Sequence, residues 1–370
     1  MTQMFGSPSS YVQGKDVLFD SVKYLEKFGS RAVLISDNMV YDIVGQRFES
    51  YLGKNGFTIT RAKFQGEASP EEIDRITNIG KKAAVNFIIG LGGGKTLDSA
   101  KAVADNLGVA VAILPSLAST DAPCSRLSVI YNEDGSFKEY RFYDMNPNLV
   151  LVDTRLVAGA PVRLLASGIA DALATNVESQ AVAKGDSETM LGAKQTLVGN
   201  AIAQKCEETL FKYGHLAIES VKKHTVTSAL NKIIEANTLM SGVGFESGGL
   251  AAAHAIHDGL TVLDGPIHDL THGEKVAFGT LTQLFLEGCS EEKFNRYLSF
   301  DLSLGLPTTF EDLKIPNVTD EELLKVGERA TSPADTMNRM PFTVTADDIV
   351  QAMRGVDAYS HAFKEKYAEK

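Results

Sequence analysis

Four of the seven histidines of this 370-residue chain stand close together, between positions 254 and 272. His254 and His257 are three residues apart in a segment of helical periodicity, so they share one helix face. His268 and His272 follow the residues Asp-Gly-Pro at 264–266, which indicate a loop or a helix start. Because imidazole nitrogens commonly bind Zn²⁺, the group predicts a metal site, but spacing alone does not choose among the four. The alternative for any single histidine is a structural residue with ordinary partners.

An acid in an apolar helix is the second element of this prediction. Asp171 lies within the segment ASGIADALAT, where a carboxylate faces a costly burial unless it is paired or bound to a metal. Two imidazoles and one carboxylate from separate helices suit a catalytic Zn²⁺ and leave one position for water or substrate. Asp258 and Asp269 are candidates for orienting an imidazole, and the alternative for both is a solvated loop acid.

A glycine-rich loop, GLGGGKT at 90–96, follows an apolar strand and opens a helix. Glycines let a backbone approach a phosphate, and the free N–H groups of a helix start favour an anion. The loop is no Walker A motif, because Ile89 stands where a glycine is required, and Lys95 likewise breaks the pattern G-x-G-x-x-G. We therefore predict a phosphate loop of another type; the alternative is a plain strand–helix turn.

Asp37 ends an early strand. There a carboxylate can accept hydrogen bonds from ribose hydroxyls and repel a 2′-phosphate. From the sequence alone, the alternative of a helix N-cap is favoured.

The sequence divides into two regions with different predicted secondary structure, and these must position the residues named above. Up to about residue 160, apolar strand-like runs alternate with helix-like segments, which predicts an α/β domain with a parallel sheet covered on both faces. From about residue 161 the periodicity is helical throughout, which predicts an all-α domain over 161–370. The expected strands are 31–37, 57–64, 85–94, which runs into the glycines, 109–115 and a last strand-like piece that begins at 149 and precedes a turn at 159–161. The expected helices are 40–56, 69–83, 95–108, 162–183, 194–214, 229–245, 249–263 and 274–288.

Net charge, cysteine number and the distribution of apolar residues exclude several classes of protein. The net charge is −11 and the sequence has no block of lysine and arginine, which argues against a nucleic-acid partner. Three separate cysteines favour a reducing compartment over a disulfide framework. With neither a signal-peptide pattern at the start nor an apolar run that could span a bilayer, we expect a cytoplasmic protein without a membrane partner.

Several long stretches resemble the glycerol dehydrogenase branch of the iron-type alcohol dehydrogenase superfamily: GLGGGKTLDSAK, STDAPCSRLSVIY, VAGAPVRLLASGIADALAT, GVGFESGGLAAAHAIHDGLT and THGEKVAFGTLTQL. The resemblance covers nearly the whole chain. It implies a Rossmann-like NAD-binding domain over 1–160 and a helical metal- and substrate-binding domain over 161–370, the dehydroquinate synthase-like fold. It also implies oxidation of glycerol and related 1,2-diols to products such as dihydroxyacetone, with NAD as the cofactor, one Zn²⁺ per subunit and assembly into homo-oligomers, expected to be octamers.

Site residues follow from the same resemblance, position by position. The metal ligands would be Asp171, His254 and His272, which leaves His257 and His268 as supporting or structural residues. Asp121 would hold a substrate hydroxyl and His254 would also lie against the substrate; the alternative for Asp121 is the acceptor of a turn at Ser119 and Thr120. The NAD contacts would be Asp37, Gly93, Gly94, Lys95, Ser116, Ser119, Ser125, Leu127 and Tyr131.

Four positions depart from the family pattern. Thr175 stands four residues after Asp171, where iron-binding relatives carry a further histidine ligand, so three protein ligands favour Zn²⁺ over iron. Asn176 replaces a common aromatic residue and Asn338 a histidine, changes that bear on substrate preference. Ser116 stands where threonine is common.

Two other functions compete with this prediction. A glycerol-1-phosphate dehydrogenase or a dehydroquinate-synthase-like lyase would need basic residues for a phosphorylated substrate, yet the ligand-bearing segments ASGIADALAT and GGLAAAHAIHDGLT contain none and only Lys275 follows His272. A non-catalytic sensor that binds NAD and metal would have no use for Asp121.

Overall fold

The computed structural model describes residues 1–368, which form two compact units. The sheet unit comprises Gly6–Val162 and Leu216–Gly242, and the helical unit comprises Met1–Phe5, Arg163–His215 and Val243–Lys370. The chain thus passes from one unit to the other close to the expected boundary, but 27 residues of the expected helical domain, 216–242, belong to the sheet unit. Within residues 1–368, no helix is long and apolar enough to cross a membrane.

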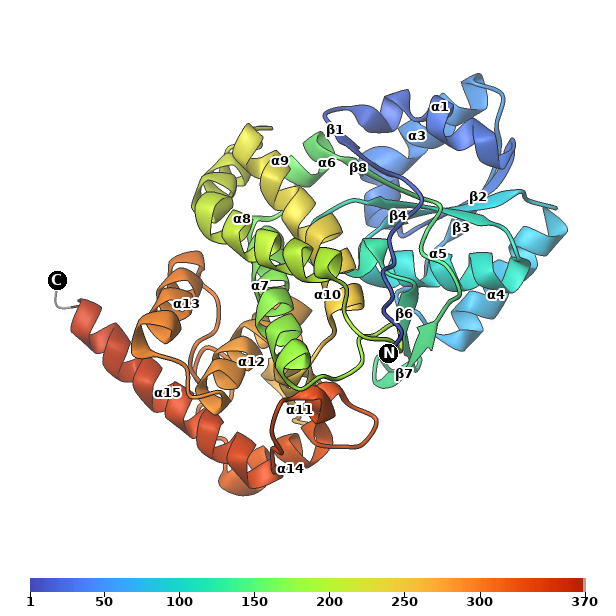
Figure 1. Ribbon diagram of the computed structural model, residues 1–370. Coiled ribbons are helices and arrows are strands. Elements are labelled where there is room, and N and C mark those ends of the chain that lie inside the picture. Colours follow the sequence, from blue (N-terminus) through green and yellow to red (C-terminus); the bar gives the residue numbers. More distant parts are fainter. Residues whose placement is uncertain (369–370) are drawn as a thin grey trace. The chain divides into compact units, whose positions relative to one another are not determined.

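Six parallel strands form the main sheet of the sheet unit, in the order β1-β8-β5-β4-β2-β3 (Figure 1). A separate antiparallel pair, β6-β7, comes after β5 in the chain. The apolar runs give the four expected inner strands and the edge strand β3, whereas β1 and the β6-β7 pair were not anticipated from the sequence. The strands are β1 (Tyr11–Gly14), β2 (Arg31–Ser36), β3 (Thr58–Lys63), β4 (Phe87–Gly92), β5 (Ala110–Pro115), β6 (Leu127–Tyr131), β7 (Phe137–Phe142) and β8 (Leu149–Asp153).

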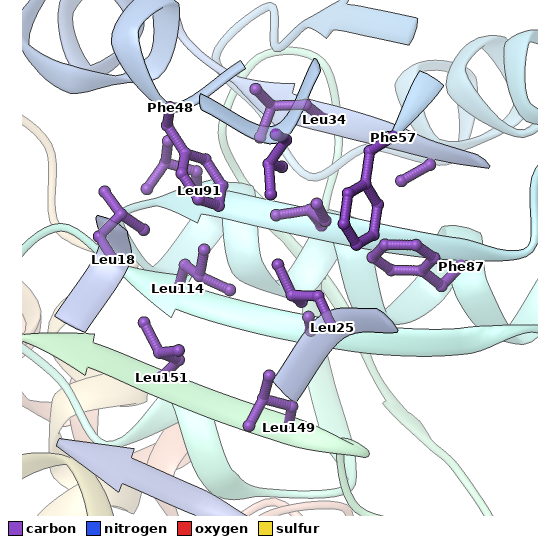
Figure 2. Packing of buried hydrophobic residues seen from close by; sticks show 14 of the residues in the cluster. Leu18, Leu25, Leu34, Phe48, Phe57, Phe87, Leu91, Leu114, Leu149 and Leu151 are labelled. Atoms are coloured by element: carbon purple, nitrogen blue, oxygen red, sulfur yellow. The ribbon is translucent and has the colours of Figure 1, made fainter. Parts of the chain in front are cut away.

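Helices cover both faces of this sheet, as the continuously apolar strands predicted. One face packs Phe87, Leu91 and Leu114 against Phe48 of helix α3 and Leu25 of helix α1 (Figure 2). The other face carries α5, which packs against β4 and β5. The helices of this unit are η1 (Val17–Asp20), α1 (Val22–Leu25), η2 (Glu26–Phe28), α2 (Asn38–Val40), the π-helix η3 (Tyr41–Gly45), α3 (Gln46–Lys54), α4 (Pro70–Lys82), α5 (Gly94–Leu107), η4 (Ala122–Cys124), α6 (Thr154–Ala158), α9 (Ser228–Glu235) and the π-helix η5 (Ala236–Met240).

The segment 216–242 joins the sheet unit through specific contacts. Helix α9 packs against α6, and η5 packs against η4. Side-chain bonds reinforce this packing: Gln13 donates to the carbonyl of Asn231 at 2.9 Å, and the hydroxyls of Tyr11 and Thr238 lie 2.8 Å apart. Helical periodicity predicts a helix but not the partner against which it packs, which is why the sequence assigned these residues to the helical domain.

The helical unit contains no strand longer than an isolated bridge among its described residues. Its long helix α7 is buried along most of its length, which explains why the sequence is apolar on nearly all sides there. Three helices, α7, α8 and α10, begin in one unit and end in the other. The helices are α7 (Val162–Lys184), α8 (Leu197–Lys222), α10 (Ser241–Gly248), α11 (Ala252–Leu260), η6 (Pro266–Asp269), α12 (His272–Leu286), α13 (Glu291–Leu304), α14 (Asp320–Ala330), η7 (Thr336–Arg339) and α15 (Ala346–Ala368).

Asp301 in α13 is a buried acid without a cation beside it. Its side chain is 2 % exposed, its Oδ1 has no hydrogen-bond partner, and burial raises its pKa well above the ordinary value. The folded state therefore binds more protons than the unfolded state above about pH 4, so this residue lowers stability as the pH rises.

We expect Asp301→Asn to raise the melting temperature at pH 8 and to leave it unchanged near pH 4, since each unit of pKa shift corresponds to about 1.4 kcal/mol. Thermal unfolding of both proteins across this pH range is the measurement. An equal melting temperature of the two proteins at pH 8 would contradict the prediction.

Candidate active site

Three helices of the helical unit bring Asp171, His254 and His272 together. Asp171 projects from the buried middle of α7, His254 lies in α11, and His272 is the first residue of α12. The Asp171 Oδ1 atom lies 3.4 Å from Nε2 of His254 and 3.1 Å from Nε2 of His272. One ligand atom from each of the three residues lies within 4.8 Å of the other two, which is a spacing that one metal ion can bridge.

Glycines and a helix cap set these three helices at short range. A Cβ atom on Gly273 would lie 1.9 Å from the carbonyl oxygen of Ser167 in α7, and one on Gly279 would lie 2.4 Å from the carbonyl oxygen of Ala253 in α11. Thr271 and Glu274 form a capping box that begins α12 and so fixes where His272 stands. At Gly273 and Gly279, helix α12 therefore packs directly against the backbones of α7 and α11.

Glu178 determines which nitrogen of His254 faces Asp171. The carboxylate of Glu178, fully buried two turns after Asp171 in α7, accepts a 2.6 Å hydrogen bond from Nδ1 of His254. Its other oxygen accepts from the backbone N–H groups of Ala251 and His254 at the start of α11. Because Nδ1 donates to Glu178, Nε2 is the nitrogen that faces Asp171 and is available to a cation. Sequence analysis missed Glu178, although its seven-residue spacing from Asp171 placed both acids on one face of an apolar helix.

A second series of hydrogen bonds orients His272. Its Nδ1 lies 3.0 Å from Nε2 of His257, whose own Nδ1 lies 2.9 Å from Oδ1 of Asp258. Since Asp258 accepts the Nδ1 proton of His257, Nε2 of His257 accepts from Nδ1 of His272, and Nε2 of His272 is the nitrogen that faces Asp171. Burial and the neighbouring His272 lower the pKa of His257 to about 3, in keeping with a neutral ring.

The electrostatics of the three residues fit a cation. Burial alone would lower the pKa of His254, but the carboxylates of Glu178 and Asp171 outweigh it and raise the pKa well above its ordinary value. Burial alone would raise the pKa of Asp171, but His272 and His254 hold it below its ordinary range. The site thus stabilises positive charge between two buried carboxylates, and a carboxylate oxygen with two imidazole nitrogens is a donor set that suits Zn²⁺.

The other residues considered for this site lie elsewhere. His268 is exposed on η6, and Asp269 pairs at 3.1 Å with Lys314. Thr175 packs against α10, where a Cβ atom on Gly244 would lie 2.7 Å from its methyl group. Of the two asparagines, Asn176 accepts a 3.5 Å bond from Gln180, and the side chain of Asn338 is bonded to the carbonyl of Pro333.

In the sheet unit, the glycine-rich loop at 90–94 allows close packing between a strand and a helix and leaves the start of that helix open. A Cβ atom on Gly90 would lie 2.6 Å from the Cβ of Ala100, and one on Gly92 would lie 2.8 Å from the hydroxyl of Thr96, so these two glycines allow α5 to pack on β4. Nothing lies within 4 Å of a Cβ on Gly93, and the start of α5 has no side-chain cap. The N–H groups of the first turn are therefore open to an anion.

The other residues predicted to contact NAD are arranged along the same edge of the sheet. Asp37 follows β2, the glycine loop follows β4 and Ser116 follows β5, and these three strands are neighbours. Asp37 also caps α2, because its carboxylate accepts a 2.9 Å bond from the N–H of Val40, as the alternative interpretation stated. The hydroxyl of Ser116 is buried without a hydrogen-bond partner. An open helix start and an orphaned hydroxyl at one sheet edge fit a dinucleotide.

Lys95 and the segment 119–131 complete the predicted set. Lys95 forms a 2.7 Å ion pair with Glu67 and lies over the ring of Tyr131, 4.9 Å from its centroid. Ser125 is fully buried and donates to the carbonyl of Ala122 at 3.3 Å. Ser119 lies in the loop after β5, and Leu127 begins β6.

A buried lysine that the sequence analysis passed over holds this segment. Lys101 of α5 pairs with Asp98 at 2.9 Å and donates to the carbonyls of Ala122 at 2.9 Å and Leu127 at 2.5 Å. Asp98 in turn accepts from the N–H of Val129 at 3.1 Å. The sequence signal was an acid and a lysine three residues apart within an apolar helix. The helix that begins at the glycine loop therefore also fixes the loop around η4.

Asp121 precedes η4 and is 9 % exposed. Its Oδ2 accepts a 2.8 Å hydrogen bond from the hydroxyl of Ser241, at the start of α10. Asp121 is therefore hydrogen-bonded to a residue 120 positions later in the chain, and no local sequence pattern predicts this contact.

Comparisons with known proteins agree with this architecture. A family model described as iron-containing alcohol dehydrogenase matches residues 8–154. Glycerol dehydrogenase 1 of Schizosaccharomyces pombe is 45% identical over 367 residues, covering 98% of this chain and 81% of that protein. A glycolaldehyde reductase of Halobacterium salinarum is 43% identical over 366 residues, covering 99% of this chain and 100% of that protein. The crystal structure of glycerol dehydrogenase from Schizosaccharomyces pombe superposes with a TM-score of 0.96 at 44% identity, over 100% of this chain and 94% of that one.

Proposed function

Because the chain belongs to the iron-containing alcohol dehydrogenase family, we propose that it is an NAD-dependent glycerol dehydrogenase. In this reaction glycerol and NAD⁺ give dihydroxyacetone, NADH and one proton, and related 1,2-diols react in the same way. Full-length relatives and a structure named as glycerol dehydrogenases support the substrate class. The two interpretations with other chemistry, a phosphate-specific enzyme and a non-catalytic sensor, have no such relative among these.

The observation that carries the proposal is the convergence of three donor atoms in the helical unit. Asp171, His254 and His272 present one ligand atom each within 4.8 Å of one another. Both histidines have their other nitrogen occupied, by Glu178 and by His257. A divalent cation bound there supplies Lewis acidity, which lowers the pKa of an alcohol and eases loss of hydride from its carbon.

We propose Zn²⁺, one per subunit, as this cation. Three protein ligands with one open position are typical of catalytic zinc. The resemblance implies that iron-binding relatives carry a further histidine ligand at the position of Thr175, and the threonine of this chain packs against Gly244 of α10 instead. The family is named for iron, so restoring metal-free protein with Zn²⁺ or with Fe²⁺ distinguishes the two metals.

For the cofactor we propose NAD rather than NADP. The carboxylate of Asp37 at the end of β2 would accept ribose hydroxyls and repel a 2′-phosphate. Gly93, Gly94 and Lys95 would hold the pyrophosphate at the start of α5, and the buried hydroxyl of Ser116 would donate to the dinucleotide. Ser119, Ser125, Leu127 and Tyr131 would line the same site.

The roles of the chain's own residues follow from these positions. Asp121 would accept a hydrogen bond from a hydroxyl of the polyol and so orient it, and His254 would contact the polyol as well as the metal. A phosphorylated polyol is not favoured, because the segments around Asp171 and His254 contain no basic residue, Lys275 is the single lysine of the helix that begins at His272, and Arg163 at the start of α7 is engaged by Glu274 at 2.6 Å. From the resemblance we further propose a cytoplasmic homo-oligomer, an octamer, which size-exclusion chromatography with light scattering would test.

The experiment that tests this function is a substrate panel on metal-free protein restored with Zn²⁺ or Fe²⁺. Glycerol, 1,2-propanediol, ethylene glycol and glycerol 1-phosphate are each offered with NAD or NADP, and reduction of the cofactor is followed by absorbance. We expect activity with glycerol, NAD and Zn²⁺, and almost none in the metal-free protein. Full activity without metal would refute the proposed site, and a preference for ethylene glycol would favour the second candidate, a glycolaldehyde reductase, for which the Halobacterium relative is named.

A further inference from the structure

The loop between β5 and β6, which carries Asp121, is held from one side by a short stretch at the junction of η5 and α10. Asn237, which is fully buried in the π-helix η5, donates a 2.9 Å hydrogen bond to the carbonyl of Ala118. Ser241, also fully buried, donates to Oδ2 of Asp121 at 2.8 Å. A Cβ atom on Gly242 would lie 2.7 Å from the carbonyl oxygen of Asp121, so this glycine lets the loop approach the helix.

These contacts fix both the backbone and the side chain of the loop. Asn237 and Gly242 contact main-chain carbonyl groups of the loop, those of Ala118 and Asp121. Of these three residues, Ser241 is the one that donates to the carboxylate, and this bond restricts rotation of the carboxylate plane. A π-helix inserts an extra residue into a helix turn and thereby changes which side chains face a neighbour; such insertions are frequent at functional sites. Here the turn directs Asn237 and Ser241 toward the same loop.

We propose that Ser241 is a positioning residue for the polyol substrate. By donating its proton to Oδ2, it holds the Asp121 carboxylate in the orientation that accepts a hydrogen bond from the substrate hydroxyl. Ser241 is 0 % exposed, so it acts through Asp121 and does not touch substrate itself. The inference rests on the proposed function of Asp121, and the experiment is arranged to separate the failure of one from the failure of the other.

The test is a double-mutant cycle of Ser241→Ala and Asp121→Ala, read out as the KM for glycerol at saturating NAD. We expect Ser241→Ala to raise this KM about tenfold, which corresponds to about 1.4 kcal/mol, with the KM for NAD and the melting temperature nearly unchanged. We expect Asp121→Ala to raise it further, and the double variant to match Asp121→Ala alone. Ser241→Cys retains size and a weak donor, so its KM should lie between those of serine and alanine.

A matched control is Thr238→Val, which removes another buried hydroxyl from η5. Thr238 donates to the carbonyl of Ile234 and contacts Tyr11, not the loop, so the KM for glycerol should stay within about twofold of wild type. An unchanged KM in Ser241→Ala and Ser241→Cys overturns the inference, as does a Ser241→Ala effect that persists in the Asp121→Ala background. An unchanged KM in Asp121→Ala instead overturns the proposed role of Asp121, whatever Ser241 does.

Discussion

Replacing His272 by asparagine is expected to remove the bound metal ion and to lower kcat/KM for glycerol about a thousandfold. Metal-ion catalysis supplies several kcal/mol of transition-state stabilisation, and each 1.36 kcal/mol corresponds to a tenfold change in rate. His272 is the best of the three ligands for this test, because its side chain is 35 % exposed while that of Asp171 is 1 % exposed. The substitution should therefore remove a ligand without leaving a large cavity or a buried unpaired charge.

His268→Asn is the matched control for this prediction. It removes a histidine from the same sequence cluster, four residues earlier, but His268 is exposed on η6 and outside the group of converging ligand atoms. Metal content by elemental analysis and kcat/KM for glycerol are measured on both variants. We expect about one equivalent of zinc in His268→Asn and almost none in His272→Asn. Loss of metal in both, or retention in both, would show that the ligands have been assigned wrongly.

Much of the sheet unit was predictable because its signals are local. The apolar runs at β4 and β5 announce strands buried on both faces, and Ser69 with Pro70 marks the start of α4, where Ser69 indeed accepts from the N–H of Glu72. Strands and helices are recognised from side-chain patterns that repeat about every two or every four residues, so a short stretch of sequence is enough to predict them. The strand β1 was missed because its four residues are only partly buried and show no clear alternation.

The parts that sequence could not supply depend on packing between distant segments. Helical periodicity at 216–242 predicted helices correctly, yet their place in the sheet unit depends on contacts with Tyr11 and Gln13. Residue type nominated four histidines, but the choice of His254 and His272 depended on the family resemblance, and the geometry of α7, α11 and α12 brings those two to Asp171. The pairing of Glu178 in α7 with His254 in α11 can be recognised only when the two helices are placed beside one another.

A second large effect is expected from Glu178→Gln, which should weaken metal binding about 10–100-fold, the usual result of removing a residue that orients a metal-binding histidine. Glutamine keeps one oxygen for the N–H groups of Ala251 and His254, so the start of α11 should persist. Its amide N–H₂ group, however, would face Nδ1 of His254. That nitrogen must then accept a hydrogen bond instead of donating one, so the ring hydrogen moves to Nε2, where the metal should bind.

The measurement is the dissociation constant for Zn²⁺ by competition with a chelating dye, on protein first stripped of metal. Glu207→Gln is the control, because Glu207 is a half-buried acid of the helical unit, is bonded to the hydroxyl of Tyr297, and is absent from the ligand set. Its metal affinity should equal that of wild type. If Glu178→Gln bound Zn²⁺ as tightly as wild type, Glu178 would serve only to cap α11, and the orientation of His254 would have to come from the packing of α11 against α12.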